Sequence, residues 1–169
     1  MLPTTYFRWL LASCCACWCA IAVGERPDPG KAALNAETLF ATDRIVDVAI
    51  EIEAADWDKI RRQSRSIADA LGEKAADSPF TYVEADVVID GVRMERVGIR
   101  KKGFLGSLSE RRPSLKIKFT EFEEKNAARA IGVDRLTLNN NKQDPSRLIQ
   151  YLSYQFFNDS GTIAPRCNF

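Results

Sequence analysis

Residues 80–101 decide the fold, and they read FTYVEADVVIDGVRMERVGIRK. From residue 80 to residue 90 apolar and polar side chains alternate, which is the two-residue period of a strand with one buried face. The pair Asp90-Gly91 favours a type I′ turn, because both central positions of that turn need a positive φ. The return strand, residues 92–101, changes its apolar parity halfway, and a bulge near Glu95-Arg96 would reconcile the two halves. These residues therefore predict a bulged β-hairpin.

Shorter elements flank the hairpin on both sides. Alternation predicts a strand at residues 45–53, and similar patterns predict strands at residues 114–120 and 136–138. Helical spacing predicts an amphipathic helix that lies on the sheet and ends at Gly72, with an apolar side made of Trp57, Ile60, Ile67 and Leu71. This order of elements predicts an α+β fold, a mostly antiparallel sheet with packed helices.

A second helix is expected near the end of the sequence. We expect Asp144 to be its N-cap, Pro145 its first residue and Gly161 its C′ residue. Its apolar side chains are Leu148, Ile149, Leu152, Phe156 and Phe157. Residues 121–130 predict a short exposed helix or an excursion. Residues 163–169 look like the beginning of another strand with no turn to close it, so we expect a C-terminally truncated piece of a longer protein.

Composition excludes several classes of function. The 169 residues can hold one ordinary domain or part of a larger one. The sequence contains no histidine, which excludes Ser-His-Asp hydrolysis, Cys-His proteases and every imidazole general base. Its 24 basic and 23 acidic residues argue against a nucleic-acid partner bound by bulk positive charge.

The first residues resemble an export signal. Arg8 is the only charged residue before Glu25, and the apolar run 9–23 is short for a membrane span. Small residues before Glu25 suggest cleavage after Gly24, so we expect a signal peptide at 1–24, a linker at 25–38 and a domain at 39–169. The mature chain would then be exported, to the medium, the periplasm or the cell surface, with no membrane span.

Two other interpretations of this segment stay open. Residues 11–14 resemble a bacterial lipobox, which would make Cys14 a lipidated first residue. The alternative is a retained membrane anchor. Four of the five cysteines lie in this segment and only Cys167 lies outside it, so a zinc or disulfide framework is excluded for the body of the chain.

Residues 100–112 carry the first candidate site. Arg100, Lys101 and Lys102 precede a loop in which Gly103 and Gly106 allow close approach of a ligand, and Ser107 and Arg111-Arg112 follow. Such a loop could hold phosphate oxygens through N–H groups and guanidinium pairs. It matches neither the Walker spacing nor Gly-x-Gly-x-x-Gly. The alternative is a solvated hairpin tip with ordinary surface lysines.

Lys116 and Lys118 form the second candidate, since they share one face of a predicted strand whose other face is apolar. They are plausible partners of nucleotide phosphates, and they are equally what protects an edge strand from aggregation. The run 139–144 packs three asparagines and Asp144 between a strand and a helix. These amides either face a ligand or order the loop around it. We expect no catalytic and no metal-binding residue in this sequence.

Four stretches together resemble the CotH family, spore coat protein H and its exported bacterial relatives. They are residues 97–103, 113–119, 136–146 and 164–169. The resemblance extends from about Leu39 to the end of the sequence. It implies an atypical protein-kinase-like fold that uses ATP and Mg²⁺ or Mn²⁺ to phosphorylate serine on secreted or coat proteins.

The resemblance also implies roles for particular residues. Residues 99–107 look like the strand and turn that cover the nucleotide, and Lys116 or Lys118 looks like the phosphate-contacting lysine of the small lobe. The residues expected to face the nucleotide are Arg100, Lys102, Gly103, Ser107, Lys116, Lys118 and Asn141. Ile149 and Gln150 stand where many relatives have an Arg-Glu pair, so the usual lysine–glutamate ion pair is missing here. The family's metal-binding and catalytic acids lie beyond Phe169.

Two main functions follow from these expectations. The first is the incomplete N-terminal portion of an exported CotH-type kinase, whose substrate is an extracytoplasmic protein. The alternative is a non-catalytic surface or coat-assembly module that binds a protein partner on the same fold. A weaker third hypothesis is an anion- or glycan-binding sandwich in which the Gly103 loop is only a surface tip. The sequence gives no indication of the oligomeric state.

Overall fold

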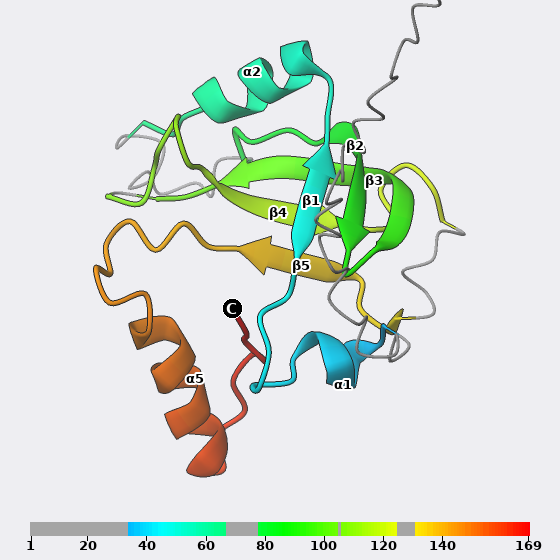
Figure 1. Cartoon of the computed structure of the whole chain (residues 1–169). Helices are drawn as coiled ribbons and strands as arrows, with labels where there is room; N and C mark the ends of the chain where they lie inside the picture. Colours follow the sequence, from blue (N-terminus) through cyan, green and yellow to red (C-terminus); the bar gives the residue numbers. More distant parts are fainter. Residues whose placement is uncertain (1–33, 67–77, 105, 125–130) are drawn as a thin grey trace, which may run out of the picture. The chain divides into compact units, whose positions relative to one another are not determined.

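The computed structural model describes residues 34–66, 78–104, 106–124 and 131–169 of the chain (Figure 1). The expected signal peptide, the possible lipidation site and most of the expected linker lie outside these residues. Ile67, Leu71 and Gly72 of the first predicted helix also lie outside them. The last residues of the expected linker run into a short helix, α1 (Ala36–Leu39), which the Asn35 side chain caps.

Five antiparallel strands form one sheet in the order β1-β2-β3-β4-β5, so strands adjacent in sequence are adjacent in space. Their bounds are Val48–Glu51, Val83–Ile89, Val92–Lys102, Ser114–Lys118 and Arg135–Leu138. Figure 1 shows that the sheet curls, with β1 and β5 as its two edges. The predicted α+β class and the mostly antiparallel sheet are confirmed.

The central hairpin has the predicted geometry. Asp90 and Gly91 have φ angles of 48° and 82°, as a type I′ turn requires. Between the pairs Ala85–Val97 and Val87–Met94 the register shifts, so that Asp86 lies opposite two residues, Glu95 and Arg96. Arg96 has a φ of 52°, and its N–H donates to the Asp86 carboxylate over 3.1 Å. The predicted bulge is therefore confirmed, and it restores the alternation of the second half of β3.

The core lies on one face of the sheet. Alternate residues of β2, β3 and β4 point into it and are almost fully buried: Val83, Ala85, Val87, Ile89, Met94, Val97, Ile99, Leu115 and Ile117. Phe119, which follows β4, and Ile60 of α2 have no exposed surface either. Except for Ala85, each of these side chains contributes about 1.5–3 kcal/mol to stability relative to an exposed position. The hairpin and β4 thus provide most of the core.

The first predicted helix is shorter than expected. Helix α2 spans Ala54–Arg62, with Ile60 buried and Trp57 half-buried against the core. It ends because Gln63 leaves the helical region, with φ −57° and ψ 140°. The Gln63 side chain instead donates to the Thr81 hydroxyl over 2.7 Å and accepts from the Thr81 N–H over 3.3 Å. The prediction of an unbroken helix through residues 63–66 is therefore wrong.

The second predicted helix also begins later than expected. Helix α5 spans Ile149–Asp159, because Arg147 has a φ of 62° and delays the helical conformation. Asp144 is therefore not the N-cap, although its carboxylate accepts from the Ile149 N–H over 2.8 Å. The C-terminal end of α5 is as predicted. Gly161 has a φ of 81°, and the Thr162 N–H donates to the Phe157 carbonyl over 2.8 Å, which completes a Schellman motif.

The apolar side of α5 is exposed to solvent. No residue of α5 is buried, and the exposed fractions reach 57% at Leu152 and 69% at Phe156. This helix does not pack on the sheet in the way that we expected from its apolar pattern. Among the described residues, no helix is long and apolar enough to cross a membrane.

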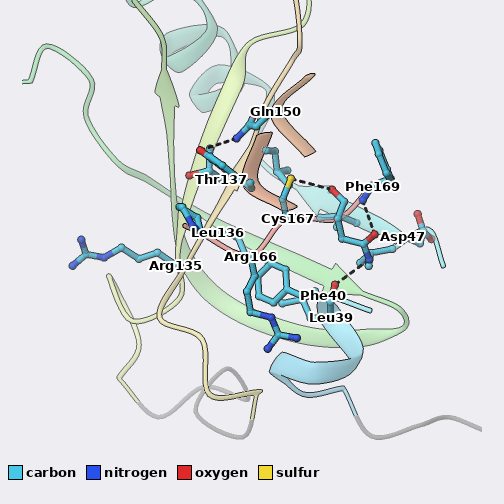
Figure 2. Close-up of a pocket in the computed structure, with 16 residues that line it drawn as sticks. Leu39, Phe40, Asp47, Arg135, Leu136, Thr137, Gln150, Arg166, Cys167 and Phe169 are labelled. Atoms are coloured by element: carbon cyan, nitrogen blue, oxygen red, sulfur yellow. Dashed lines mark hydrogen bonds between the residues drawn. The ribbon is translucent and has the colours of Figure 1, made fainter. Parts of the chain in front are cut away.

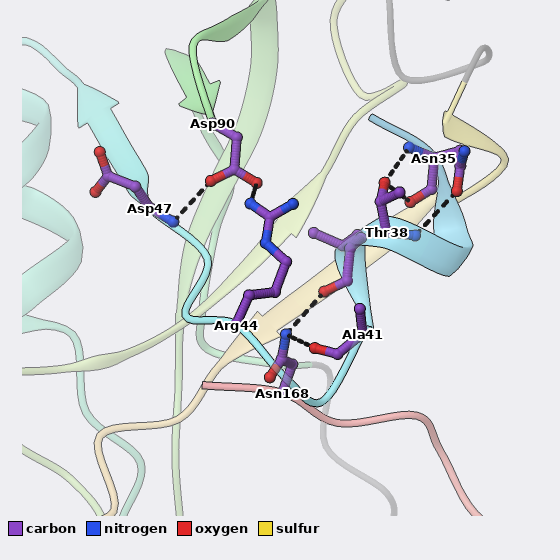
Figure 3. Close-up of polar contacts among 8 residues, drawn as sticks. Asn35, Thr38, Ala41, Arg44, Asp47, Asp90 and Asn168 are labelled. Atoms are coloured by element: carbon purple, nitrogen blue, oxygen red, sulfur yellow. Dashed lines mark hydrogen bonds and ion pairs between the residues drawn. The ribbon is translucent and has the colours of Figure 1, made fainter. Parts of the chain in front are cut away.

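The last residues return to the start of the domain. The Val46 N–H donates to the Phe169 carbonyl over 2.9 Å, and Arg166 forms an ion pair with Glu37 at 2.7 Å. The Asn168 amide donates to the Ala41 carbonyl over 2.7 Å (Figure 3) and to the Leu39 carbonyl over 3.3 Å. These contacts join the C-terminal segment to α1 and to the residues before β1.

Candidate functional site

A positively charged cleft lies at the end of the β3–β4 ladder, and we call it the cationic cleft. Its volume is about 400 Å³, and its lining residues are Arg65, Ser78, Phe80, Arg100, Lys102, Gly103, Phe104, Ser107 and Lys116. Five of the seven residues expected to face a nucleotide lie in it, namely Arg100, Lys102, Gly103, Ser107 and Lys116. No acidic side chain is among the lining residues.

The alternation of β3 sorts its three consecutive cations between the two faces of the sheet. Lys101 continues the core-facing series of Val97 and Ile99, and only 1% of it is exposed. Arg100 and Lys102 have the opposite parity and line the cationic cleft. The sequence run Arg-Lys-Lys therefore supplies two cleft residues and one interior residue.

Like charges are concentrated in the cationic cleft. Arg100 lies directly opposite Lys116 in the antiparallel ladder, and Lys102 is two residues further along β3. Burial, and then the charge of Lys116, lowers the pKa of Lys102 below its usual value. Like charges opposite each other destabilise a sheet. An anion held between them would remove this repulsion.

The cleft cations have few partners of their own. Arg100 donates to the Ser78 hydroxyl over 3.1 Å and lies over the Tyr82 ring, 5.2 Å from its centroid. The Arg65 guanidinium is 6.0 Å from the centroid of the Phe80 ring. Within the described parts of the chain, neither the Lys102 ammonium nor the Lys116 ammonium has a hydrogen bond or an ion pair, although both residues pair through the main chain in the ladder. Their ammonium groups are available to a ligand.

The loop after β3 is held in a tight conformation at one side of the cleft. Gly106 has a φ of 81°, and a Cβ there would lie 2.4 Å from the Gln143 side chain. The Ser107 hydroxyl accepts from the Phe104 N–H over 2.8 Å and donates to the Phe104 carbonyl over 3.0 Å. Ser107 thus lines the cleft while its hydroxyl closes the loop.

Asn140 orders this loop, a role that its place in the asparagine run did not distinguish from those of Asn139 and Asn141. It is 7% exposed, and its amide donates to the carbonyls of Ser107 and Arg112 over 3.0 and 2.9 Å. The Arg112 guanidinium donates back to the Asn140 carbonyl over 2.9 Å. Of the two roles considered for the asparagine run, ordering the loop is the one that Asn140 has. The run itself was the available signal, but it does not show which amide is buried.

Asn141 and Lys118, the remaining two expected residues, lie outside the cationic cleft. Asn141 lines a separate pocket of about 170 Å³ and has a φ of 47°. Lys118 lies opposite Gly98 in the ladder and forms an ion pair with Glu121 at 2.6 Å, which raises the pKa of Lys118. The two lysines of β4 therefore have different environments, and Lys116 is the one that faces the cleft.

A larger cavity, of about 770 Å³, lies elsewhere and contains none of the expected site residues. It is lined by β5, by residues before β1, by two residues of α5 and by the C-terminal segment (Figure 2). Its two arginines already have acidic partners, Arg166 with Glu37 and Arg135 with Asp134. Burial raises the pKa of Cys167 in its wall. This cavity has mixed polarity and less free positive charge than the cationic cleft.

The donor set of the cationic cleft fits phosphate oxygens and does not fit a divalent metal ion. Ammonium and guanidinium groups bind phosphate, whereas Mg²⁺ and Mn²⁺ require oxygen ligands such as carboxylates. In the part of the chain that the structure describes, no cluster of three or more His, Cys, Asp or Glu residues could hold a metal ion.

Comparison with known proteins finds a similarity to one family in the second part of the chain. The sequence model of the CotH family, described as CotH kinase protein, matches residues 99–169, somewhat less than half of the chain. No curated protein and no solved structure matches. The match confirms the expected family resemblance for these residues. It includes most of the cationic cleft, but not Arg65, Ser78 or Phe80.

Proposed function

We propose that this CotH-like chain binds the phosphate groups of ATP in the cationic cleft, as the small-lobe part of an exported protein kinase. The observation that carries the proposal is the position of Arg100 opposite Lys116 in the ladder, beside a Lys102 whose ammonium has no ion-pair partner among the described residues. Like charges directly opposite each other destabilise a sheet, and a polyphosphate bound between them would compensate for this repulsion. Export belongs to the proposal and not to the observations, because it rests on the sequence of residues 1–24, which lie outside the described residues.

The described side chains suggest a division of roles. The ammonium groups of Lys116 and Lys102 would contact phosphate oxygens as point charges. The guanidinium groups of Arg100 and Arg65, which lie over the rings of Tyr82 and Phe80, would bind other phosphate oxygens. Phe80 and Phe104 would give the cleft apolar walls. ATP would supply the γ-phosphoryl group: its phosphorus would bond to a serine oxygen of an extracytoplasmic protein as the bond to ADP breaks, and the serine hydroxyl proton would be released. We assign no role to a metal ion, because the described residues contain no site that fits one.

Two lysines of the same strand test the proposal. Lys116→Ala removes a cleft cation, and a charge-assisted hydrogen bond is worth about 1.5–3 kcal/mol, so the affinity for ATP should fall roughly tenfold or more. Lys118→Ala is the matched control, because its ammonium is paired with Glu121 outside the cleft. Isothermal titration calorimetry with ATP in the absence of metal measures the affinities of both variants. Equal and small effects of the two substitutions would contradict the proposal.

A second candidate function is a non-catalytic module that binds a protein partner. The observation that favours it is the exposed apolar side of α5, which includes Ile149, Leu152 and Phe156. Under this hypothesis the wild-type chain, correctly folded, would bind neither ATP nor inorganic tripolyphosphate. Measurable binding of either compound in the calorimeter would favour the kinase-type hypothesis.

A further inference from the structure

Lys101 is the one cation of the Arg-Lys-Lys run that the proposed function does not use. Its side chain crosses the core from β3 and donates to the main-chain carbonyl of Arg61 over 2.5 Å. Only 1% of the residue is exposed, and burial lowers the pKa of its ammonium, with Glu110 as a weaker opposing influence. No described carboxylate forms an ion pair with it. A buried lysine of this kind costs stability unless it has a structural use.

The carbonyl of Arg61, which accepts the hydrogen bond from Lys101, shows what the structural use of this lysine is. Arg61 lies in the last turn of α2, where the final carbonyls have no partner within the helix. A cation at this end also interacts favourably with the helix dipole. Lys101 therefore acts as a C-terminal cap for α2, supplied by a strand that is 40 residues away in sequence.

The segment that follows this cap forms one wall of the cationic cleft. At Gln63 the chain turns out of the helix, and the Gln63 side chain is hydrogen-bonded to Thr81. Two residues later, Arg65 lines the cleft and lies over Phe80. The position of Arg65 thus depends on two anchors, Lys101 at the end of α2 and Thr81 just beyond it.

We propose that Lys101 is a positioning residue, which caps α2 and thereby holds Arg65 in the wall of the cationic cleft. One strand then performs two tasks, since Arg100 and Lys102 contact the anion while Lys101 fixes the opposite wall. The binding part of this inference rests on the proposed function. The effect on α2 does not, because it follows from the contact with Arg61 alone.

Inorganic tripolyphosphate without metal is the probe for the binding part. Lys101→Met, which keeps most of the side-chain volume, should weaken binding about tenfold, as Arg65→Met should. The double variant should bind no more weakly than either single variant, because both remove the same contact. Lys118→Met is the control for the loss of one lysine charge outside the cleft, and its affinity should stay within about twofold of the wild type.

Multiplicative losses in the double variant, about a hundredfold, would overturn the proposal, because Lys101 would then act independently of Arg65. Wild-type affinity in Lys101→Met would overturn it as well. If Lys101→Met does not fold, as judged by circular dichroism, Lys101→Arg decides. Arginine can donate to the Arg61 carbonyl, so near-wild-type affinity is expected, and a tenfold loss in a folded Lys101→Arg protein would contradict the proposal.

A ligand-free measurement separates this inference from the proposed function. Trp57 lies on α2, and Trp9→Phe with Trp18→Phe leaves it as the only tryptophan of the full chain. Acrylamide should quench its fluorescence more strongly in Lys101→Met than in Lys118→Met. If the wild type binds no tripolyphosphate but this difference is present, the proposed function fails while the capping of α2 stands. Equal quenching in the two variants would contradict the capping role.

Discussion

Replacing Asn140 with alanine should loosen the loop that forms one side of the cationic cleft. The Asn140 amide donates to two main-chain carbonyls, those of Ser107 and Arg112, and its oxygen accepts from the Lys142 N–H over 3.1 Å. Asn140 is almost completely buried, so the substitution leaves these groups without a partner in a region that water reaches poorly. An unsatisfied buried group costs about 1–3 kcal/mol.

The expected loss of stability for Asn140→Ala is therefore about 2–4 kcal/mol, since partial hydration would relieve some of the cost. With an m-value of about 2 kcal/mol per molar, the urea midpoint should fall by about 1–2 M. Asn141→Ala is the matched control, because its side-chain amide makes one hydrogen bond to the described residues, and that bond is 3.4 Å long and exposed. Its cost should be about 1 kcal/mol or less, mainly from the positive φ.

Urea unfolding followed by far-ultraviolet circular dichroism measures both variants, and tripolyphosphate binding is measured on the folded proteins. We expect Asn140→Ala to weaken binding as well, since the carbonyl of Ser107 loses its anchor. Equal midpoints for Asn140→Ala and Asn141→Ala would show that the amide does not order the loop. Stability lowered as expected, with unchanged binding, would show that the loop conformation is not needed for the anion.

Two further predictions concern close packing and pH. Gly98→Ala should lower the free energy of unfolding in urea by about 1–3 kcal/mol, because the new Cβ would lie 2.6 Å from the Glu121 Cβ. Adding Glu121→Gly should recover part of this loss. An unchanged urea midpoint in Gly98→Ala would refute the clash. Hydrogen bonds from the Ser146 hydroxyl, and then from main-chain N–H groups including that of Ile149, lower the pKa of Asp144 below 3.8. The stability that Asp144 provides is therefore present above pH 3.8 and lost as the pH falls through the lowered pKa. Asp144→Asn should flatten the stability profile in this acid range, and an unchanged profile would contradict the assigned hydrogen bonds.

Local patterns in the sequence predicted the sheet well. The alternation of residues 80–101 fixes which side chains are buried, the Asp90-Gly91 pair fixes the turn, and the change of parity locates the bulge. Each of these features is determined by neighbours in sequence or by the next strand. Prediction was correct where the physical cause was local.

The C-terminal end of α5 was predicted from Gly161, but the C-terminal end of α2 and the first residue of α5 were not. Helix α2 stops at a residue that bonds Thr81 and beside a carbonyl that Lys101 caps, and both partners are distant in sequence. Helix α5 starts late because Arg147 adopts a left-handed conformation, for which the sequence gives no signal. The position of Arg65 in the cleft could not be predicted either, because it depends on α2 ending at Arg62.

The candidate site was predictable in composition but not in detail. Lys116 and Lys118 have the same parity, so alternation alone cannot separate them, whereas the ladder places them opposite Arg100 and Gly98. The asparagine run indicated an ordered loop, but burial of Asn140 depends on the loop from Gly103 to Pro113 folding over it. Choosing among equivalent residues required the tertiary structure.

The most direct test of the cationic cleft is a titration of the ¹⁵N-labelled chain with tripolyphosphate, followed residue by residue by NMR. We expect the amide shifts of Ser78, Phe80, Lys102, Ser107 and Lys116 to change together with one dissociation constant. Lys118 and residues around the larger cavity, such as Tyr154 and Cys167, should shift little. Changes concentrated around that cavity, or no saturable change at all, would contradict the assignment of phosphate binding to the cleft.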